Sequence, residues 1–199
     1  MKKLLFFIPF ALLFAFVPKT EPLAIGADLP KADIKLKDVS GNEITLESAA
    51  GKNGLLVMFS CNTCPVVIEN QSRAKEICAY AKKNNIGVVV LNSNEASRAN
   101  SESLESMKSY AKAQGYNWYY AEDKNHVLAD AFGATRTPEC FLFNKDGKLI
   151  YHGAIDDSPQ DAGSVKRVHL KEAINESVQG KNVSVQKTKS VGCGIKRLG

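Results

Sequence analysis

The sequence predicts a single α/β domain, in which helices flank a central mixed β-sheet and a short β-hairpin precedes that sheet. Two apolar runs, 55–59 and 88–91, are short and uninterrupted, as is typical of strands buried on both faces. Between residues 67 and 81 apolar side chains recur at steps of three and four, which predicts a helix. At 199 residues the chain is long enough for one domain with a full core and short for two.

The remaining predicted elements are two hairpins and three helices. Residues 34–36 and 44–46 alternate apolar and polar side chains around a Ser-Gly-Asn turn, and this pattern predicts the first hairpin. An Asp-Gly turn at residue 146 joins the strands of the second. The strands of that hairpin are expected over 140–143 and 148–151, and the helices over 101–114, 126–132 and 165–178.

Residues 1–22 are typical of an export signal. Lys2 and Lys3 give a charged start, and the apolar run 4–17, interrupted by Pro9, is too short to span a bilayer comfortably. The cleavage site is uncertain, and an uncleaved segment would attach the protein to the membrane. In either case we expect the folded domain in the periplasm, or otherwise outside the cytoplasm.

Residues 23–180 are expected to form the domain, and 181–199 a basic tail that wraps its surface. The formal net charge is +5 and falls to +3 without Lys2 and Lys3. A charge of that size gives no reason to expect a nucleic-acid partner.

The five cysteines of the chain allow several kinds of site. In an oxidising compartment thiols tend to pair, and an odd number leaves at least one thiol without an internal partner. The spacing of Cys61 and Cys64 fits a structural disulfide, a metal site or a redox catalyst. The residues around the pair must decide between them.

The segment Cys61-Asn62-Thr63-Cys64-Pro65 follows a buried strand and begins a helix. Unpaired N–H groups and the dipole at a helix N-terminus favour an anion, so we expect a lowered thiol pKa at Cys61. Two intervening residues allow Cys64 to close a reducible disulfide with Cys61. Pro65 suits the first helical turn, where its missing N–H would have no partner.

Thr137-Pro138 introduces the strand at 140–143. A proline there is a candidate for a cis peptide bond beside the cysteines, with backbone groups that hold an extended substrate. Together with the strand and helix around Cys61 and Cys64, this dipeptide favours a redox pair over a structural or metal site.

These motifs, in this order, resemble the redoxin (alkyl hydroperoxide reductase–thiol-specific antioxidant) branch of the thioredoxin superfamily, and within it the peroxiredoxin-like thioredoxin proteins. The resemblance implies a thioredoxin fold and a thiol–disulfide oxidoreductase that needs no cofactor or metal. It also implies protein thiols and disulfides as partners, with a further redox partner that resets the pair. The matching segments are 25–26, 41–46, 59–65, 91–94, 133–138, 151–157 and 191–196.

Two departures from the family pattern stand out. The tail ends Arg197-Leu198-Gly199, where the family often has Trp. Thioredoxin's buried carboxylate beneath the pair has no counterpart in the strand 55–59, so another group must manage the proton of Cys64. Glu139, next to Pro138, is one candidate, although we interpret it as an exposed residue on a strand edge.

Two alternative functions stay open. Peroxidases of this superfamily have a P-x-x-x-T-x-x-C frame, and alignment on Cys64 places Val57 and Cys61 at the expected Pro and Thr. Copper-delivery proteins of the fold have three residues between their cysteines and a distant His ligand, whereas the spacing here is two. Both departures favour disulfide exchange.

The other cysteines receive separate interpretations. Cys78 lies on an apolar helix face and Cys140 in a strand, and both are expected to pack in the core. Cys193, between two glycines in the tail, is a possible additional redox thiol; a structural bridge, for example to Cys140, or a free thiol are the alternatives. Whether the pair reduces or oxidises its partners stays open, because related folds have reduction potentials from about −270 to about −120 mV.

Overall fold

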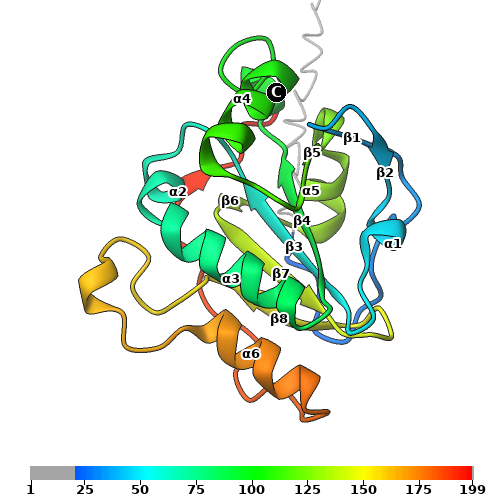
Figure 1. Cartoon of the computed structure of the whole chain (residues 1–199), viewed down its shortest axis with the longest axis vertical. Helices are drawn as coiled ribbons and strands as arrows, with labels where there is room; N and C mark the ends of the chain where they lie inside the picture. The colour runs from blue at the N-terminus through cyan, green and yellow to red at the C-terminus, as the bar shows by residue number, and fades with distance from the viewer. Residues whose placement is uncertain (1–20, 199) are drawn as a thin grey trace, which may run out of the picture.

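The structure is a computed structural model that describes residues 21–198 (Figure 1). Seven strands form one mixed sheet in the order β2-β1-β5-β4-β3-β7-β8. Its parallel strands are β3 (Leu55–Ser60), β4 (Gly87–Asn92) and β5 (Tyr119–Glu122). The antiparallel strand β7 (Glu139–Phe143) pairs with β3, and β8 (Leu149–Gly153) pairs with β7. On the other side β1 (Leu36–Asp38) pairs with β5, and β2 (Glu43–Ile44) pairs with β1.

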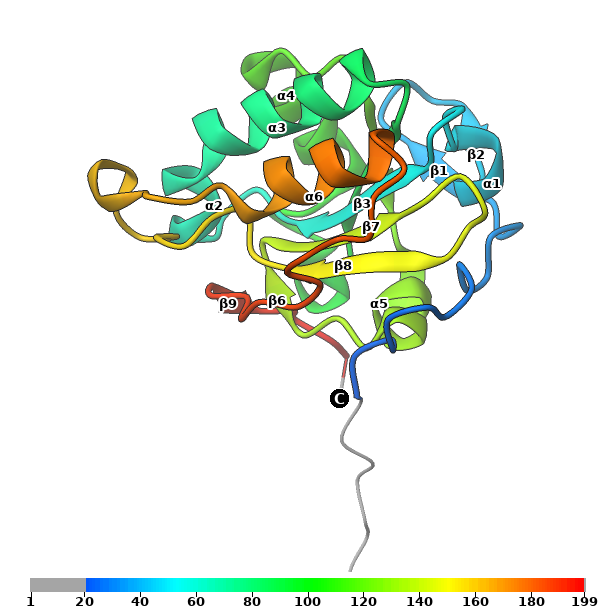
Figure 2. The same cartoon turned by 90° about the horizontal axis from the view of Figure 1, so that it is seen from below.

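Helices cover both faces of the sheet (Figure 2). One face packs under α3 (Gln71–Lys83), α4 (Leu104–Gln114) and α6 (His169–Val178). The other packs against α1 (Leu46–Ala49) and α5 (Val127–Phe132). The remaining helical segments are α2 (Pro65–Glu69) and the 3-10 turns η1 (Glu95–Ser97), η2 (Lys124–His126) and η3 (Ala162–Ser164).

The core lies on both sides of β3, whose six residues are all buried. Successive strand side chains point to opposite faces, so Leu56 and Met58 enter the cluster under α3, and Leu55, Val57 and Phe59 enter the other. Burial on both faces explains the uninterrupted apolar run. It also holds the end of β3 in a defined position, and Cys61 is the next residue.

The predicted fold class is confirmed, with differences in detail. The predicted strand 44–46 ends at Ile44, because Leu46 begins α1, and the helix predicted over 101–114 begins at Leu104. The strand β5 was not predicted, since its sequence Tyr-Tyr-Ala-Glu has neither an apolar run nor regular alternation. The helix after the cysteines is two helices that meet at Asn70. The last helix begins at His169 rather than at residue 165, and residues 165–168 are not helical.

The chain ends bear on the predicted organisation. The expected export signal, 1–22, lies almost wholly outside the described residues, and within 21–198 no helix has the length and apolarity needed to cross a membrane. The tail returns along β8 and then forms β9 (Cys193–Gly194), which pairs with β6 (Arg136–Thr137) in a separate small sheet. The tail is therefore built into the fold beside the cysteines.

Candidate active site

Cys61 and Cys64 lie where the central strand ends and the first helix begins. Cys61 follows Ser60, the last residue of β3, and Cys64 is the N-cap of α2 with Pro65 at the first helical position. The first helical hydrogen bond runs from the Ile68 N–H to the Cys64 carbonyl at 3.0 Å. The helix start therefore falls at Cys64 and not, as predicted, at Cys61.

The environment of Cys61 does not lower its thiol pKa. Only 1% of Cys61 is exposed, and this burial raises the pKa, with a further rise from the Glu102 carboxylate. The Thr137 hydroxyl, 3.4 Å from the Cys61 sulfur, and the N–H groups of Thr63 and Cys64 lower the pKa by less. The prediction of a lowered pKa is wrong for this state, because desolvation outweighs the nearby donors.

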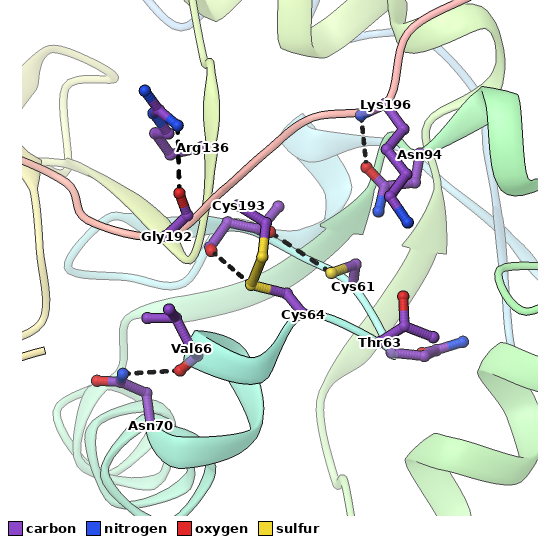
Figure 3. The surroundings of a disulfide bond; sticks show 12 residues. Cys61, Thr63, Cys64, Val66, Asn70, Asn94, Arg136, Gly192, Cys193 and Lys196 are labelled. Carbon is purple, nitrogen blue, oxygen red and sulfur yellow. Dashed lines mark hydrogen bonds between the residues drawn. A yellow bond between two sulfur atoms is a disulfide. The ribbon is translucent and has the colours of Figure 1, made fainter. Parts of the chain in front are cut away.

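Cys64 is bonded to Cys193 of the tail, and Cys61 is a free thiol (Figure 3). The two bonded cysteines are 129 positions apart in sequence, with Cα atoms 6.0 Å apart. The pairing of Cys193 with Cys140, weighed as one alternative, is wrong. Cys140 is a free thiol in β7, fully buried in the core, and Cys78 is a free buried thiol of α3 as predicted.

Thr137, the residue before Pro138, lies directly against the sulfur atoms. The peptide bond between Thr137 and Pro138 is cis, as predicted. The carbonyl oxygen of Thr137 is 3.4 Å from the Cys64 sulfur, and its hydroxyl contacts Cys61. Thr137 pairs with Cys193 in the small sheet. The five predicted site residues, Cys61, Cys64, Thr137, Pro138 and Cys193, thus meet in one place.

Glu102 is a site residue that sequence reasoning missed. Its carboxylate is fully buried and accepts hydrogen bonds from the Asn62 N–H at 3.0 Å, the Thr63 hydroxyl at 2.8 Å and the Asn92 side-chain amide at 2.6 Å. A buried carboxylate therefore does contact the segment between the two cysteines, although it comes from the loop before α4 and not from β3. The sequence feature that could have pointed to a polar site here is Asn92, a polar residue at the end of a buried strand. In the sheet, Asn92 lies opposite Ser60, next to Cys61.

Glu139 holds the loop that carries Thr137 and Pro138. It is 3% exposed and accepts hydrogen bonds from the backbone N–H groups of Thr135 and Arg136 at 2.8 and 2.9 Å. Its other oxygen contacts His152 at 2.6 Å. The interpretation of Glu139 as an exposed edge residue is wrong, because β7 lies between β3 and β8 and has no free edge.

The chain is similar to several known proteins. The family model described as Redoxin matches residues 24–168. The thiol-disulfide oxidoreductase ResA of Bacillus thuringiensis subsp. konkukian is 24% identical over 143 residues, covering 72% of this chain and 77% of that protein. A hypothetical protein of Sinorhizobium meliloti, solved by crystallography, is 32% identical with a TM-score of 0.81, covering 89% of this chain and 97% of the other.

The fold has a further match in the thioredoxin domain of a thiol-disulfide oxidoreductase from Bacteroides vulgatus. Its TM-score is 0.54 at 18% identity, over 66% of this chain and 89% of that domain, which shows the fold alone. The similarity to proteins named thiol-disulfide oxidoreductases agrees with the predicted enzyme class. Since the family match spans most of the chain, the protein belongs to the Redoxin family and has the thioredoxin fold.

Proposed function

We propose that this protein is an extracytoplasmic thiol–disulfide oxidoreductase that exchanges disulfides with partner proteins. The observation that carries the proposal is the meeting of three cysteines, a free Cys61 and the bonded pair Cys64–Cys193, against Thr137. The names of sequence relatives support the chemistry. The charged and apolar N-terminal residues support export.

The proposed exchange begins at Cys61. Its thiol loses a proton to water, and the thiolate attacks one sulfur of a partner disulfide, whose other sulfur leaves as a thiolate. A mixed disulfide between Cys61 and the partner results. The Cys64 thiolate then attacks the Cys61 sulfur, which releases the reduced partner and leaves a Cys61–Cys64 disulfide.

Cys193 is proposed as a third redox thiol in this cycle. Its thiolate attacks the Cys64 sulfur and displaces Cys61 as a thiolate, which gives the bonding pattern of the structure. This last step conserves the number of disulfides, so a separate redox partner must still reduce the protein. The same steps run in reverse when the partner is a dithiol, and the relative reduction potentials set the direction.

Thr137 and Pro138 are proposed to hold the partner chain. Thr137 contacts both sulfur atoms of the C-x-x-C pair and lies in the two-residue strand β6. A partner chain that pairs with this strand would bring its own disulfide next to Cys61. Ile68, on the helix that starts at Cys64, is 56% exposed and offers apolar contact to a protein partner nearby.

Insulin reduction tests the proposed function. With dithiothreitol as reductant, we expect the wild-type protein to accelerate insulin precipitation. Cys61→Ser should lower the rate by about a hundredfold, because the variant lacks the attacking thiolate. Cys78→Ala, which removes a buried thiol away from the site, serves as the control and should keep the rate. Equal rates for wild type and Cys61→Ser would contradict the proposal.

A further inference from the structure

The C-terminal tail lies on the edge of β6, where the proposed function requires a partner protein to bind. Strand β9 pairs antiparallel with β6, with Cys193 opposite Thr137 and Gly194 opposite Arg136. The Arg136 side chain also donates to the Gly192 carbonyl at 3.3 Å (Figure 3). The backbone edge that would hold an extended partner chain is therefore paired with the protein's own tail.

The fit of this tail depends on a glycine at one position. A Cβ atom added at Gly192 would collide with the carbonyl oxygen of Thr137, so only glycine allows this close approach. At Gly194, two residues further on, an added Cβ atom would meet nothing within 4 Å. A methyl group would therefore displace the tail at Gly192, whereas the same group fits at Gly194 without a collision.

The tail is anchored on both sides of this contact. Upstream, the Thr188 hydroxyl accepts from the Ala154 N–H at 2.9 Å. Downstream, the buried Ile195 donates its N–H to the Thr135 carbonyl at 3.1 Å, and the Lys196 N–H donates to the Asn94 side chain at 2.9 Å. We call the span between these anchors, residues 189–194, the tail segment.

The hydrogen bonding of the tail segment is less complete than that of its anchors. The hydroxyl of Ser190 is buried and has no hydrogen-bond partner. A buried hydroxyl without a partner costs free energy that contact with water would restore. The Cys64–Cys193 bond therefore keeps the tail segment in its place on the protein. When the segment moves away, the Ser190 hydroxyl can bond to water, and the contacts of Thr188 and Ile195 keep the segment near the site.

We propose that the tail segment is an autoinhibitory element that occupies the partner-binding edge of β6 as long as Cys193 is bonded to Cys64. This proposal rests on the proposed function. Cys61 releases the segment: its thiolate attacks the Cys64 sulfur, the Cys64–Cys193 bond breaks and the Cys61–Cys64 bond forms. The electron pair leaves on Cys193, which takes up the proton that Cys61 gave to water, so no external oxidant or reductant is needed.

The experiment compares Gly192→Ala with Gly194→Ala in the oxidised full-length protein. The first readout is the summed rate at which iodoacetamide alkylates Cys61 and Cys193, followed by mass spectrometry, because lifting of the segment exposes Cys61 and the exchange step then frees Cys193. The second is the initial rate of exchange with a reduced synthetic peptide that contains two cysteines. We expect Gly192→Ala to raise both rates by about tenfold or more, because the collision with Thr137 unseats the segment. Gly194→Ala should stay within about twofold of wild type.

The two readouts separate this proposal from the proposed function. Equal alkylation rates in wild type, Gly192→Ala and Gly194→Ala would overturn the autoinhibitory role. If alkylation differs as expected but no variant exchanges with the peptide, the segment covers Cys61 and the proposed function is overturned.

Hydrogen exchange gives a test that needs no substitution. Backbone amides of the tail segment should exchange about tenfold faster or more in the reduced wild-type protein than in the oxidised one. Amides of the core strand β3 provide the internal control and should stay protected in both states. Equal exchange of the tail segment in the two redox states would overturn the proposal, whatever the variants do.

Discussion

The charge of Glu102 provides a sharp test of the site. Glu102→Gln keeps the size of the side chain and one acceptor oxygen for the Asn62–Thr63 segment but removes the negative charge. Since that charge raises the pKa of Cys61, its removal should lower this pKa. The substitution therefore changes the proton affinity of the thiol more than the shape of the site.

Coulomb's law sets the size of the effect. Glu102 contacts Asn62 and Thr63, the two residues after Cys61. Two unit charges about 8 Å apart interact by about 2 kcal/mol at an effective dielectric constant of about 20. Loss of that repulsion should raise the thiolate population of Cys61 near neutral pH by about tenfold to thirtyfold.

The assay is the pH dependence of Cys61 alkylation in the oxidised protein, followed by mass spectrometry. Access to the sulfur scales the rate equally at every pH, whereas the midpoint of the profile reports the thiol pKa. We expect the midpoint of Glu102→Gln to fall below that of wild type. Glu105→Gln removes an exposed carboxylate in the first turn of α4 and should leave the midpoint unchanged.

A Glu102→Gln protein that is folded by circular dichroism, yet has the wild-type midpoint or a higher one, would refute this reasoning. It would mean that the carboxylate only shapes the loop and does not act on Cys61 through its charge.

Three further predictions follow from single contacts. Thr137→Val removes the hydroxyl that lowers the Cys61 pKa, so the alkylation midpoint should rise; a fall would contradict the contact. Cys193→Ser should lower the free energy of unfolding of the oxidised protein by up to about 5 kcal/mol, the chain-entropy value for a bond that spans 129 positions; guanidinium titration showing no loss would contradict the Cys64–Cys193 bond. Burial raises the pKa of Cys78 to about 12, whereas an unfolded thiol ionises near about 8.5, so stability should fall by about 1.4 kcal/mol per pH unit above that value. Cys78→Ala should remove this contribution, and an unchanged alkaline slope would contradict it.

The sequence predicted the parts of the fold that depend on local patterns. The apolar runs of β3 and β4 identified buried strands, and the residues from Cys61 to Pro65 identified the start of a helix after the first of them. The strand β5 was missed because Tyr119 is exposed and the four-residue segment has neither an apolar run nor regular alternation, so its strand character depends on pairing with β4.

The missing parts of the site depend on contacts between distant segments. Cys193 was named from the sequence as a possible redox thiol, but its bond to Cys64, 129 positions away and made from a strand of two residues, is revealed by no local pattern. Glu102 sits in a loop, where an acidic residue is ordinarily exposed; only its contact with Asn62 makes it part of the site. The pKa of Cys61 was predicted in the wrong direction because the prediction placed Cys61 at the helix start and did not include its burial.

Trapping of the mixed disulfide tests the central claim most directly. In Cys64→Ser the resolving thiol is absent, so Cys61 should retain a partner peptide after attack on its disulfide. The reduced variant is mixed with insulin, and peptide mapping under non-reducing conditions identifies the bonded cysteine. We predict an insulin chain attached to Cys61. Attachment at Cys193 alone, or no attachment, would contradict the account.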